Sequence, residues 1–125
     1  CMVQENVSRC TSGSLDFLVK MKNALGEKAS FVLDVKQAHR AGHDPIEMVK
    51  ALGGNIRHVH FSDSGKNGDC LKFGFGEYDN AAFFSELKAC GFDGNVILEL
   101  YRNGYGDETE LAENYFILQD YLKNI

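Results

Sequence analysis

The chain has 125 residues, of which 44% are hydrophobic and 25% are charged, a composition typical of one globular domain. Its formal net charge of -5 at pH 7, with 13 Lys and Arg residues that form no basic cluster, argues against nucleic acid as a partner. No apolar run is long enough to span a membrane, and the N-terminus is too short and too polar for a signal peptide, so we expect no membrane partner and a cytoplasmic location.

The hydrophobic pattern alternates between strands and helices along the chain. Short runs rich in Val, Ile, Leu and Phe predict strands at residues 2–7, 30–35, 56–63 and 95–101. Each strand is followed by a helical pattern, at residues 14–26, 44–54, 79–91 and 107–122. Because parallel strands need crossover connections and helices usually supply them, this order predicts an α/β fold with a parallel sheet built from four βα units.

The predicted helices carry recognisable end signals. The first ends at Gly26, and the second begins with Asp44 as N-cap and Pro45 at the first helical position, after a loop that follows strand 30–35. Asp79 and Asp107 are the expected N-caps of the last two helices. The residues expected to face the core are Leu15, Leu18, Val19 and Leu25, then Phe83, Phe84 and Leu87, and finally Leu111, Tyr115, Leu118 and Leu122. Residues 64–69 are expected to be a polar loop.

Polar side chains occur at the C-terminal end of every predicted strand. They are Glu5, Asp34, the pair His58 and His60, and Glu99. A charged group within an apolar strand is costly unless it is paired or bound to a cation, and the C-terminal ends of parallel strands meet at one edge, where active sites are built. Three carboxylates and an imidazole suit Mn²⁺, Mg²⁺ or Co²⁺. A purely structural role, at exposed strand edges and turns, remains the alternative.

Several motifs occur in an order that resembles a known family. They are EN at 5–6, LDVxQAxxAGxD at 33–44, HVHFSDS at 58–64, FGxGEYD at 73–79 and GFDGNVILELY at 91–101. Together they resemble the C-terminal half of the xylose isomerase-like TIM barrels, which include sugar-phosphate isomerases and epimerases and the family 2 AP endonucleases. The resemblance covers nearly the whole chain and implies the (βα)4 half of an eight-stranded barrel.

The resemblance also implies a reaction and a ligand set. Glu5, Asp34, His60 and Glu99 would hold one divalent metal ion, which would be Mn, Mg, Co or Zn. Glu5 and Glu99 would be catalytic and would move protons next to the carbonyl of a small sugar or sugar phosphate, through an enediolate. The residues expected to contact substrate or to support the ligands are Gln37, His58, Asp63, Lys66 and Arg102.

Two alternatives to the isomerase or epimerase remain open. The first is an AP endonuclease, but many family members carry a histidine three residues after the ligand aspartate, where this chain has Gln37, and the nuclease Asp-x-His pair is replaced here by residues 69–71 (DCL). His39 and His43 lie nearby and are expected to be solvated rather than bound to metal. The second alternative is a non-catalytic fragment whose strand-end polar residues are structural.

The chain is expected to be incomplete. It starts at Cys1 without a methionine and enters at once on a predicted strand, so residues 1–125 are expected to form a single domain that is the half-barrel piece of a longer protein. A half barrel leaves open sheet edges, and we therefore expect association of two copies through them. The 4 Cys residues form neither a CxxC motif nor zinc-finger spacing, so structural zinc and disulfides are not expected.

Overall fold

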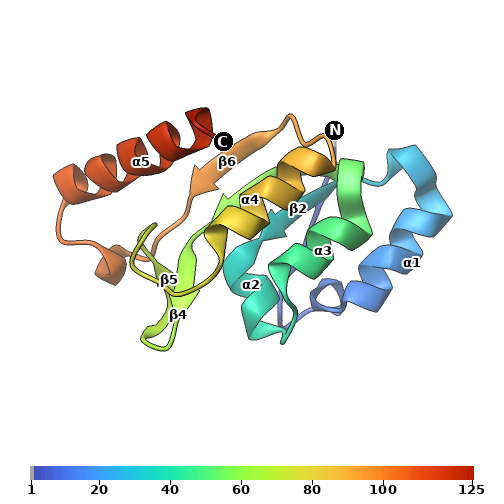
Figure 1. Ribbon diagram of the computed structural model, residues 1–125. Helices are drawn as coiled ribbons and strands as arrows, with labels where there is room; N and C mark the ends of the chain where they lie inside the picture. The colour runs from blue at the N-terminus through green and yellow to red at the C-terminus, as the bar shows by residue number, and fades with distance from the viewer. Residues whose placement is uncertain (1) are drawn as a thin grey trace.

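The computed structural model describes residues 2–125. A four-stranded parallel sheet lies at the centre of the fold (Figure 1). Its strands are β1 (Gln4–Glu5), β2 (Phe31–Asp34), β3 (Ile56–Phe61) and β6 (Asn95–Leu98), in the spatial order β1-β2-β3-β6. Strand order follows chain order, with helical connections between neighbours, so the predicted α/β class and half-barrel arrangement are confirmed.

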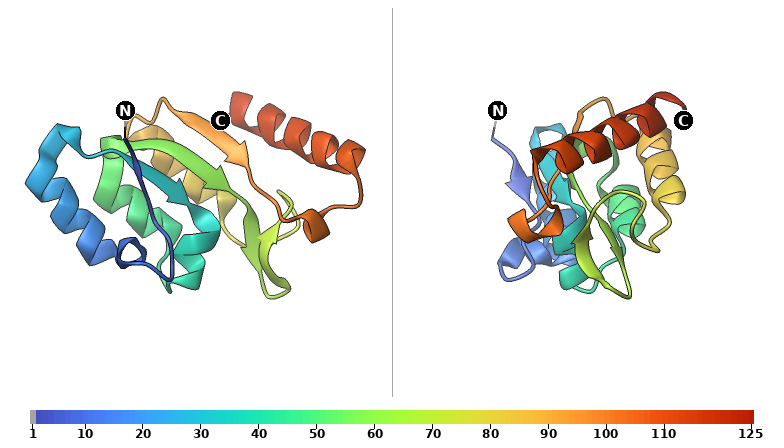
Figure 2. Two further views of the ribbon diagram at one scale, coloured as in Figure 1. Left: turned by 180° about the vertical axis from the view of Figure 1, so that it is seen from behind. Right: turned by 90° about the vertical axis from the view of Figure 1, so that its left-hand side faces the viewer.

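The helices lie on one face of this sheet and at its sides. They are α1 (Leu15–Leu25), α2 (Val35–Arg40), α3 (Pro45–Leu52), α4 (Asn80–Ala89) and α5 (Glu108–Lys123). The reverse view in Figure 2 shows the other sheet face, which none of the helices among the described residues crosses. None of these helices combines the length and apolarity needed to cross a bilayer, among residues 2–125.

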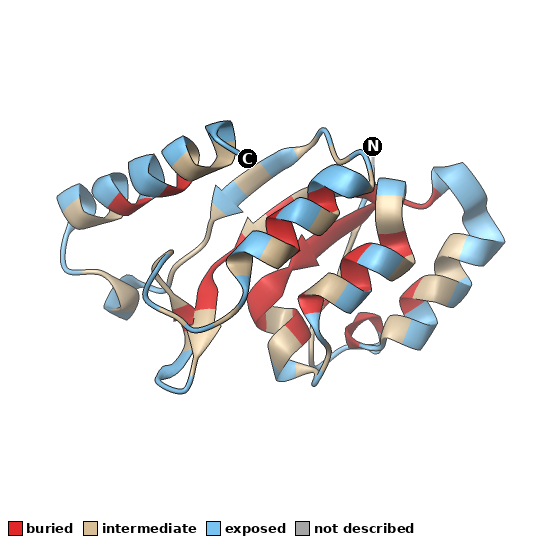
Figure 3. Ribbon diagram, in the orientation of Figure 1, coloured by how far each residue is buried: buried red, intermediate tan, exposed pale blue. Residues whose placement is uncertain are grey.

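The core lies between the sheet and the helices that cover it. Phe31, Leu33, Val59 and Phe61 are fully buried and share the covered face of β2 and β3. Figure 3 shows the matching buried stripes on α3 and α4, which the predicted Phe83, Phe84 and Leu87 help to form. Full burial of each such side chain stabilises the fold by about 1.5–3 kcal/mol, so the covered face holds most of the fold's apolar stabilisation.

The strand register assigns the polar residues to the uncovered face. Val32 is paired with His58, and Asp34 with His60, which in turn is paired with Ile97 in β6. Paired residues point to the same side of a sheet, and residues two apart on one strand do so as well. The open face therefore carries Glu5 on β1, Asp34 at the end of β2, and His58 and His60 on β3.

The predicted helix caps are present. The carboxylates of Asp44, Asp79 and Asp107 accept hydrogen bonds from backbone N–H groups in the first turns of α3, α4 and α5, each at 2.9 Å. Gly26 follows α1 with φ of 57°, a conformation that favours glycine. These short-range signals thus located the starts of three helices and the end of a fourth.

Other predictions are corrected by the structure. The loop expected after strand 30–35 is helix α2, which starts directly after Asp34, and the expected loop 64–69 lies in a hairpin of β4 (Asp63–Gly65) and β5 (Gly68–Leu71). The four strands are shorter than predicted, since β1 keeps only Gln4–Glu5, β3 ends at Phe61 and β6 ends at Leu98.

Two of the residues assigned to helix core faces are exposed instead. Leu25 is 46% exposed at the end of α1, and Tyr115 is 44% exposed on α5, because few elements pack against the outer turns of these helices. Leu118 is buried as predicted. Asn114 is also buried, because its side-chain amide exchanges hydrogen bonds with the backbone N–H and C=O of Phe73. The three cysteines among the described residues are free, and Cys1 lies outside them.

Candidate metal centre

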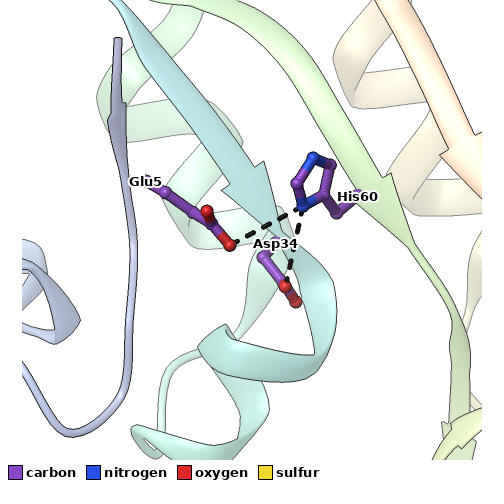
Figure 4. A group of neighbouring side chains, drawn as sticks. All are labelled: Glu5, Asp34 and His60. Atoms are coloured by element: carbon purple, nitrogen blue, oxygen red, sulfur yellow. Dashed lines mark ion pairs between the residues drawn. The ribbon is translucent and has the colours of Figure 1, made fainter. Parts of the chain in front are cut away.

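Three of the predicted ligands meet at the C-terminal ends of three adjacent strands. Nδ1 of His60 lies 3.6 Å from Oε1 of Glu5 and 4.0 Å from Oδ2 of Asp34 (Figure 4). One ligand atom from each residue lies within 4.8 Å of the others, a spacing that could hold a metal ion. The parallel register of β1, β2 and β3 thus brings together residues that are far apart in the sequence.

The imidazole of His60 has an unsatisfied nitrogen that faces these carboxylates. Its Nδ1 atom is buried and has no hydrogen-bond partner, although Oε2 of Glu99 lies 2.9 Å from it. Buried polar atoms are almost always satisfied, so an exception calls for an unseen partner. A divalent cation would satisfy Nδ1 and neutralise the carboxylates around it, and the donor set therefore fits the metal that the motifs imply.

Asp34 is held firmly from its backbone and from one carboxylate oxygen. It is 2% exposed, its Oδ1 accepts a hydrogen bond of 2.9 Å from the N–H of Gln37, and this bond caps α2. The side chain of Asn6 donates to its C=O at 2.9 Å and accepts from its N–H at 2.7 Å. These reciprocal bonds fix the end of β1 to the end of β2, and they leave Oδ2 of Asp34 for a cation.

Electrostatics at this cluster favour uptake of a proton or a cation. Burial is the main cause that raises the pKa of Glu5 above its ordinary value; the charges of Asp34 and Glu99 act in the same direction, whereas those of His60 and Lys36 oppose it. Burial also raises the pKa of Asp34, although the hydrogen bond from the Gln37 amide works in the other direction. Both shifts mean that the ionised carboxylates are short of compensating charge.

Glu99 approaches the group from the other side but is shared with a lysine. It follows β6 directly, and its Oε1 accepts a hydrogen bond of 2.9 Å from Nζ of Lys36, while Oε2 faces His60. Lys36 is only 3% exposed, and its Nζ lies 3.6 Å from Oδ2 of Asp34 and 4.9 Å from the centre of the Tyr101 ring. Glu99 is therefore not one of the three residues in the compact group.

Lys36 is the functional candidate that the sequence reasoning missed. Burial lowers the pKa of its side chain, but the hydrogen bond to Glu99 and the charges of Asp34 and Glu99 outweigh this effect and raise it overall. The side chain therefore stays an ammonium. Its position two residues after a predicted ligand was the available signal, but a lysine on a short segment is usually assigned to the surface.

The structure places Gln37 and His58 beside the candidate metal centre. Oε1 of Gln37 accepts hydrogen bonds from the N–H of Ser8 at 3.0 Å and from its hydroxyl at 2.7 Å. Gln37 also lines a cavity of about 480 Å³ with Val7, Ser8, Arg9 and Arg40. The ring of His58 stands edge-on to that of His60 at 5.2 Å, and burial, with a smaller effect of His60, lowers its pKa.

The other three predicted contact residues make their contacts with nearby turns and loops. Asp63 is fully buried, and its carboxylate accepts hydrogen bonds from the backbone N–H groups of Ser64, Gly74 and Gly76. The side chain of Lys66 is 87% exposed, with Glu77 3.8 Å from its Nζ. Arg102 donates to the carbonyls of Tyr105 and Gly106.

The hairpin is joined to the helices around the site by an arginine. Arg40 of α2 binds Asp69 of β5 with two nitrogen atoms and donates to the hydroxyl of Tyr101 at 2.9 Å. These hydrogen bonds lower the pKa of Asp69, which is thereby fully engaged.

His39 and His43, which were expected to be solvated rather than bound to metal, are half-buried and contact other residues. The His39 ring stands edge-on to Tyr78 at 4.8 Å, and Nε2 of His43 accepts from the N–H of Leu15 at 3.3 Å.

Comparison with known proteins agrees with this fold. Residues 3–123 match the profile of the xylose isomerase-like TIM barrel family. An uncharacterized protein of Mycobacterium leprae (strain TN) is 34% identical over 103 residues, which cover 78% of this chain and 37% of that protein. An uncharacterized protein of Mycobacterium tuberculosis (strain ATCC 25618 / H37Rv) is 33% identical over 95 residues, covering 71% of this chain and 34% of that protein.

A solved structure has a backbone fold similar to that of this chain. The structure of an L-ribulose 3-epimerase aligns with a TM-score of 0.55 and 22% identity, covering 89% of this chain and 34% of that chain, a likeness in fold. The chain thus spans little more than a third of the length of the relatives and the solved structure that it matches. With nearly all of its residues matched by the profile, it belongs to the xylose isomerase-like TIM barrel family.

Proposed function

We propose that the chain is the metal-binding half of an enzyme that isomerises or epimerises a small sugar or sugar phosphate. Its family includes sugar isomerases and epimerases, and a similar solved structure is that of an L-ribulose 3-epimerase. The observation that carries the proposal is the buried, unpartnered Nδ1 of His60, which faces Glu5, Asp34 and Glu99 at the ends of the strands.

Glu5, Asp34, His60 and Glu99 would hold one divalent ion, which we propose to be Mn, Mg, Co or Zn. Such an ion acts as a Lewis acid that stabilises negative charge on a sugar oxygen. Asp34 and His60 would serve as fixed ligands, because one is tied by backbone hydrogen bonds and the other lies within a central strand.

Glu5 and Glu99 are proposed to move the proton. Glu5 belongs to the edge strand β1 and Glu99 follows the other edge strand, β6, so they reach His60 on the open face from opposite edges of the sheet. One glutamate would remove the proton beside the sugar carbonyl, giving an enediolate, and the other would return a proton to it. Delivery from the opposite side would invert the carbon, and delivery to the neighbouring carbon would shift the carbonyl.

Gln37 and His58 are the strongest candidates for substrate contact, because both lie next to the ligands and Gln37 lines the adjacent cavity. The side chains of the other three predicted contact residues already have partners, and they would have to leave these partners to reach a substrate. They are Asp63, Lys66 and Arg102. We therefore propose that Asp63 acts through the shape of the loop at 74–76, and that part of the substrate site lies in the chain that completes the barrel.

The two alternatives find less support. The nuclease would need further metal ligands, but Gln37 is a hydrogen-bond acceptor for Ser8, and Asp69 is held by Arg40. A non-catalytic fragment would leave unexplained why the carboxylates of Glu5, Asp34 and Glu99 all lie around the same buried nitrogen of His60. We also propose that two copies of the chain associate through the open edges of β1 and β6, without nucleic acid or membrane partners, and that the protein acts in the cytoplasm.

The decisive experiment measures metal binding and proton exchange together. Calorimetric titration of the metal-free chain with Mn²⁺ should give one site per chain, and Glu99→Gln and His60→Ala should weaken it, whereas Glu113→Gln on the exposed surface of α5 serves as the matched control. Proton exchange into a panel of ketoses in D₂O, followed by NMR, then tests the reaction in a protein of the relatives' length. Binding of several zinc ions with strand cleavage at abasic DNA would instead support the nuclease.

A further inference from the structure

Lys36 is a buried cation that the proposed reaction does not use. Its side chain is 3% exposed, and its ammonium contacts two of the proposed metal ligands, Glu99 at 2.9 Å and Asp34 at 3.6 Å. A buried charge is tolerated only when it is paired, and these carboxylates supply the pairing. Lys36 therefore neutralises part of the same negative charge that a metal ion would neutralise.

The ammonium and a metal ion would compete for the same oxygen of Asp34. Oδ1 of Asp34 is occupied by the N–H of Gln37 in the cap of α2. Oδ2 is the atom that faces His60 at 4.0 Å, and it is also the atom that lies 3.6 Å from Nζ of Lys36. A cation between Asp34 and His60 would thus stand close to the ammonium, and like charges repel strongly at such distances in a partly buried site.

Glu99 is divided between the same two cations. Its Oε1 is bound to Lys36 and its Oε2 faces His60, so the lysine holds Glu99 beside the compact group of Glu5, Asp34 and His60. Full coordination of a metal by Glu99 would require the carboxylate to turn away from the ammonium. The ring of Tyr101, 4.9 Å from Nζ, offers the displaced ammonium another partner.

We propose that Lys36 is the counter-ion of the metal-free site, and that metal binding displaces its ammonium from Glu99 and Asp34. Metal uptake is then an exchange of one cation for another, and the lysine sets the affinity by opposing the metal, chiefly through Glu99. This inference rests on the metal site of the proposed function.

The test is a Mn²⁺ titration of the full chain carrying Lys36→Met, which keeps an unbranched side chain one atom shorter and removes its charge. Mn²⁺ should bind at least about tenfold more tightly than to the wild type, because no ammonium competes with the metal for Glu99 and Asp34 or repels it. The metal-free variant should melt at a lower temperature, and Mn²⁺ should raise its melting temperature by more than it raises that of the wild type. Lys20→Met, at an exposed lysine of α1, is the matched control and should leave the affinity unchanged.

A second pair of variants tests whether the lysine acts through Glu99. The gain in affinity from Lys36→Met should be several times smaller in a Glu99→Gln background, where the shared carboxylate is gone. Lys36→Arg retains the charge, and its affinity should not exceed that of the wild type. If Lys36→Met fails to fold, Lys36→Arg still tests the inference, because a tenfold gain in Mn²⁺ affinity in that variant would overturn the inference.

The outcomes separate the inference from the proposed function. Wild-type binding with equal or weaker binding by Lys36→Met would overturn the role of Lys36 and leave the metal site standing. Binding by Lys36→Met alone would support the inference strongly. Absence of binding in both proteins would overturn the inference together with the metal site.

Discussion

The two faces of the same parallel sheet differ in what they contribute. On the covered face, Val59 and Phe61 are fully buried beneath the helices, whereas His58 and His60, which alternate with them along β3, lie half-buried on the open face. Neighbouring positions in one strand therefore have different roles. The covered face stabilises the fold, and the open face can carry unpaired polar groups because the other face supplies the apolar burial.

The largest effect expected from this comparison is on stability. Phe61→Ala should lower the free energy of unfolding by about 3–5 kcal/mol, because it removes a buried ring that packs against Phe83 and Phe84. Ile97→Ala, on the open face, should cost less than about 1 kcal/mol, because that side chain is already 48% exposed. Urea unfolding followed by circular dichroism measures both, and similar losses in the two variants would contradict the distinction between the faces.

His60→Ala should have the converse effect. Mutation of a residue that only supports a metal ligand typically weakens metal binding by about 10- to 100-fold. Removal of the imidazole, a proposed ligand itself, should therefore weaken Mn²⁺ binding by about 100-fold or more. The unfolding free energy of the metal-free chain should change by less than about 1 kcal/mol, since an unsatisfied buried nitrogen is removed with the ring. Calorimetry and urea unfolding give the two numbers, and unaltered Mn²⁺ binding would rule out His60 as a ligand.

Asn6→Ala should affect both properties moderately, because Asn6 joins β1 to β2. Its loss leaves the buried N–H and C=O of Asp34 without their partners, which should cost about 1–3 kcal/mol. Glu5 should also become less well placed relative to Asp34, so Mn²⁺ should bind more weakly. Thermal unfolding and titration test this, and a loss of stability with unchanged affinity would show that the link between the strands does not position the ligands.

The smallest expected effect is a dependence on pH. Burial raises the pKa values of Glu5 and Asp34 above the ordinary carboxyl value of about 4. Protons should therefore still compete with Mn²⁺ for these carboxylates at pH values somewhat above about 4. Affinity should therefore rise with pH through that window and then level off. In the metal-free chain the folded state holds these protons more tightly than the unfolded state, so their contribution to stability should decline as pH rises through the same window. Titrations at several pH values, with circular dichroism as a check on folding, measure both trends.

The sequence predicted most of the fold because its signals are local. A helix cap depends only on residues in the first turn, so Asp44, Asp79 and Asp107 could be identified as caps from the sequence alone. The polar residues at the ends of the predicted strands could be identified in the same way. The meeting of Glu5, Asp34 and His60 followed from the rule that the ends of parallel strands converge.

The missed features depend on tertiary contacts. Helix α2 is too short to show a period, and the β4–β5 hairpin is polar and contains Cys70 at φ of 60°. Lys36 is buried against Glu99 and the ring of Tyr101, both of which lie far along the chain. The exposure of Leu25 and Tyr115 likewise depends on which elements reach the outer turns of α1 and α5, which their own sequences do not record.

The cap that Asp34 forms on α2 has a consequence for metal selectivity. Because one oxygen of Asp34 accepts the Gln37 N–H, Asp34 would offer the proposed metal ion chiefly its other oxygen and would act as a monodentate ligand. Calcium usually takes six to eight oxygens and often chelates a carboxylate through both, whereas magnesium and manganese accept single oxygens in a smaller, regular shell. If the proposed metal binds here, the use of one Asp34 oxygen to begin a helix would bias the site against the larger calcium ion.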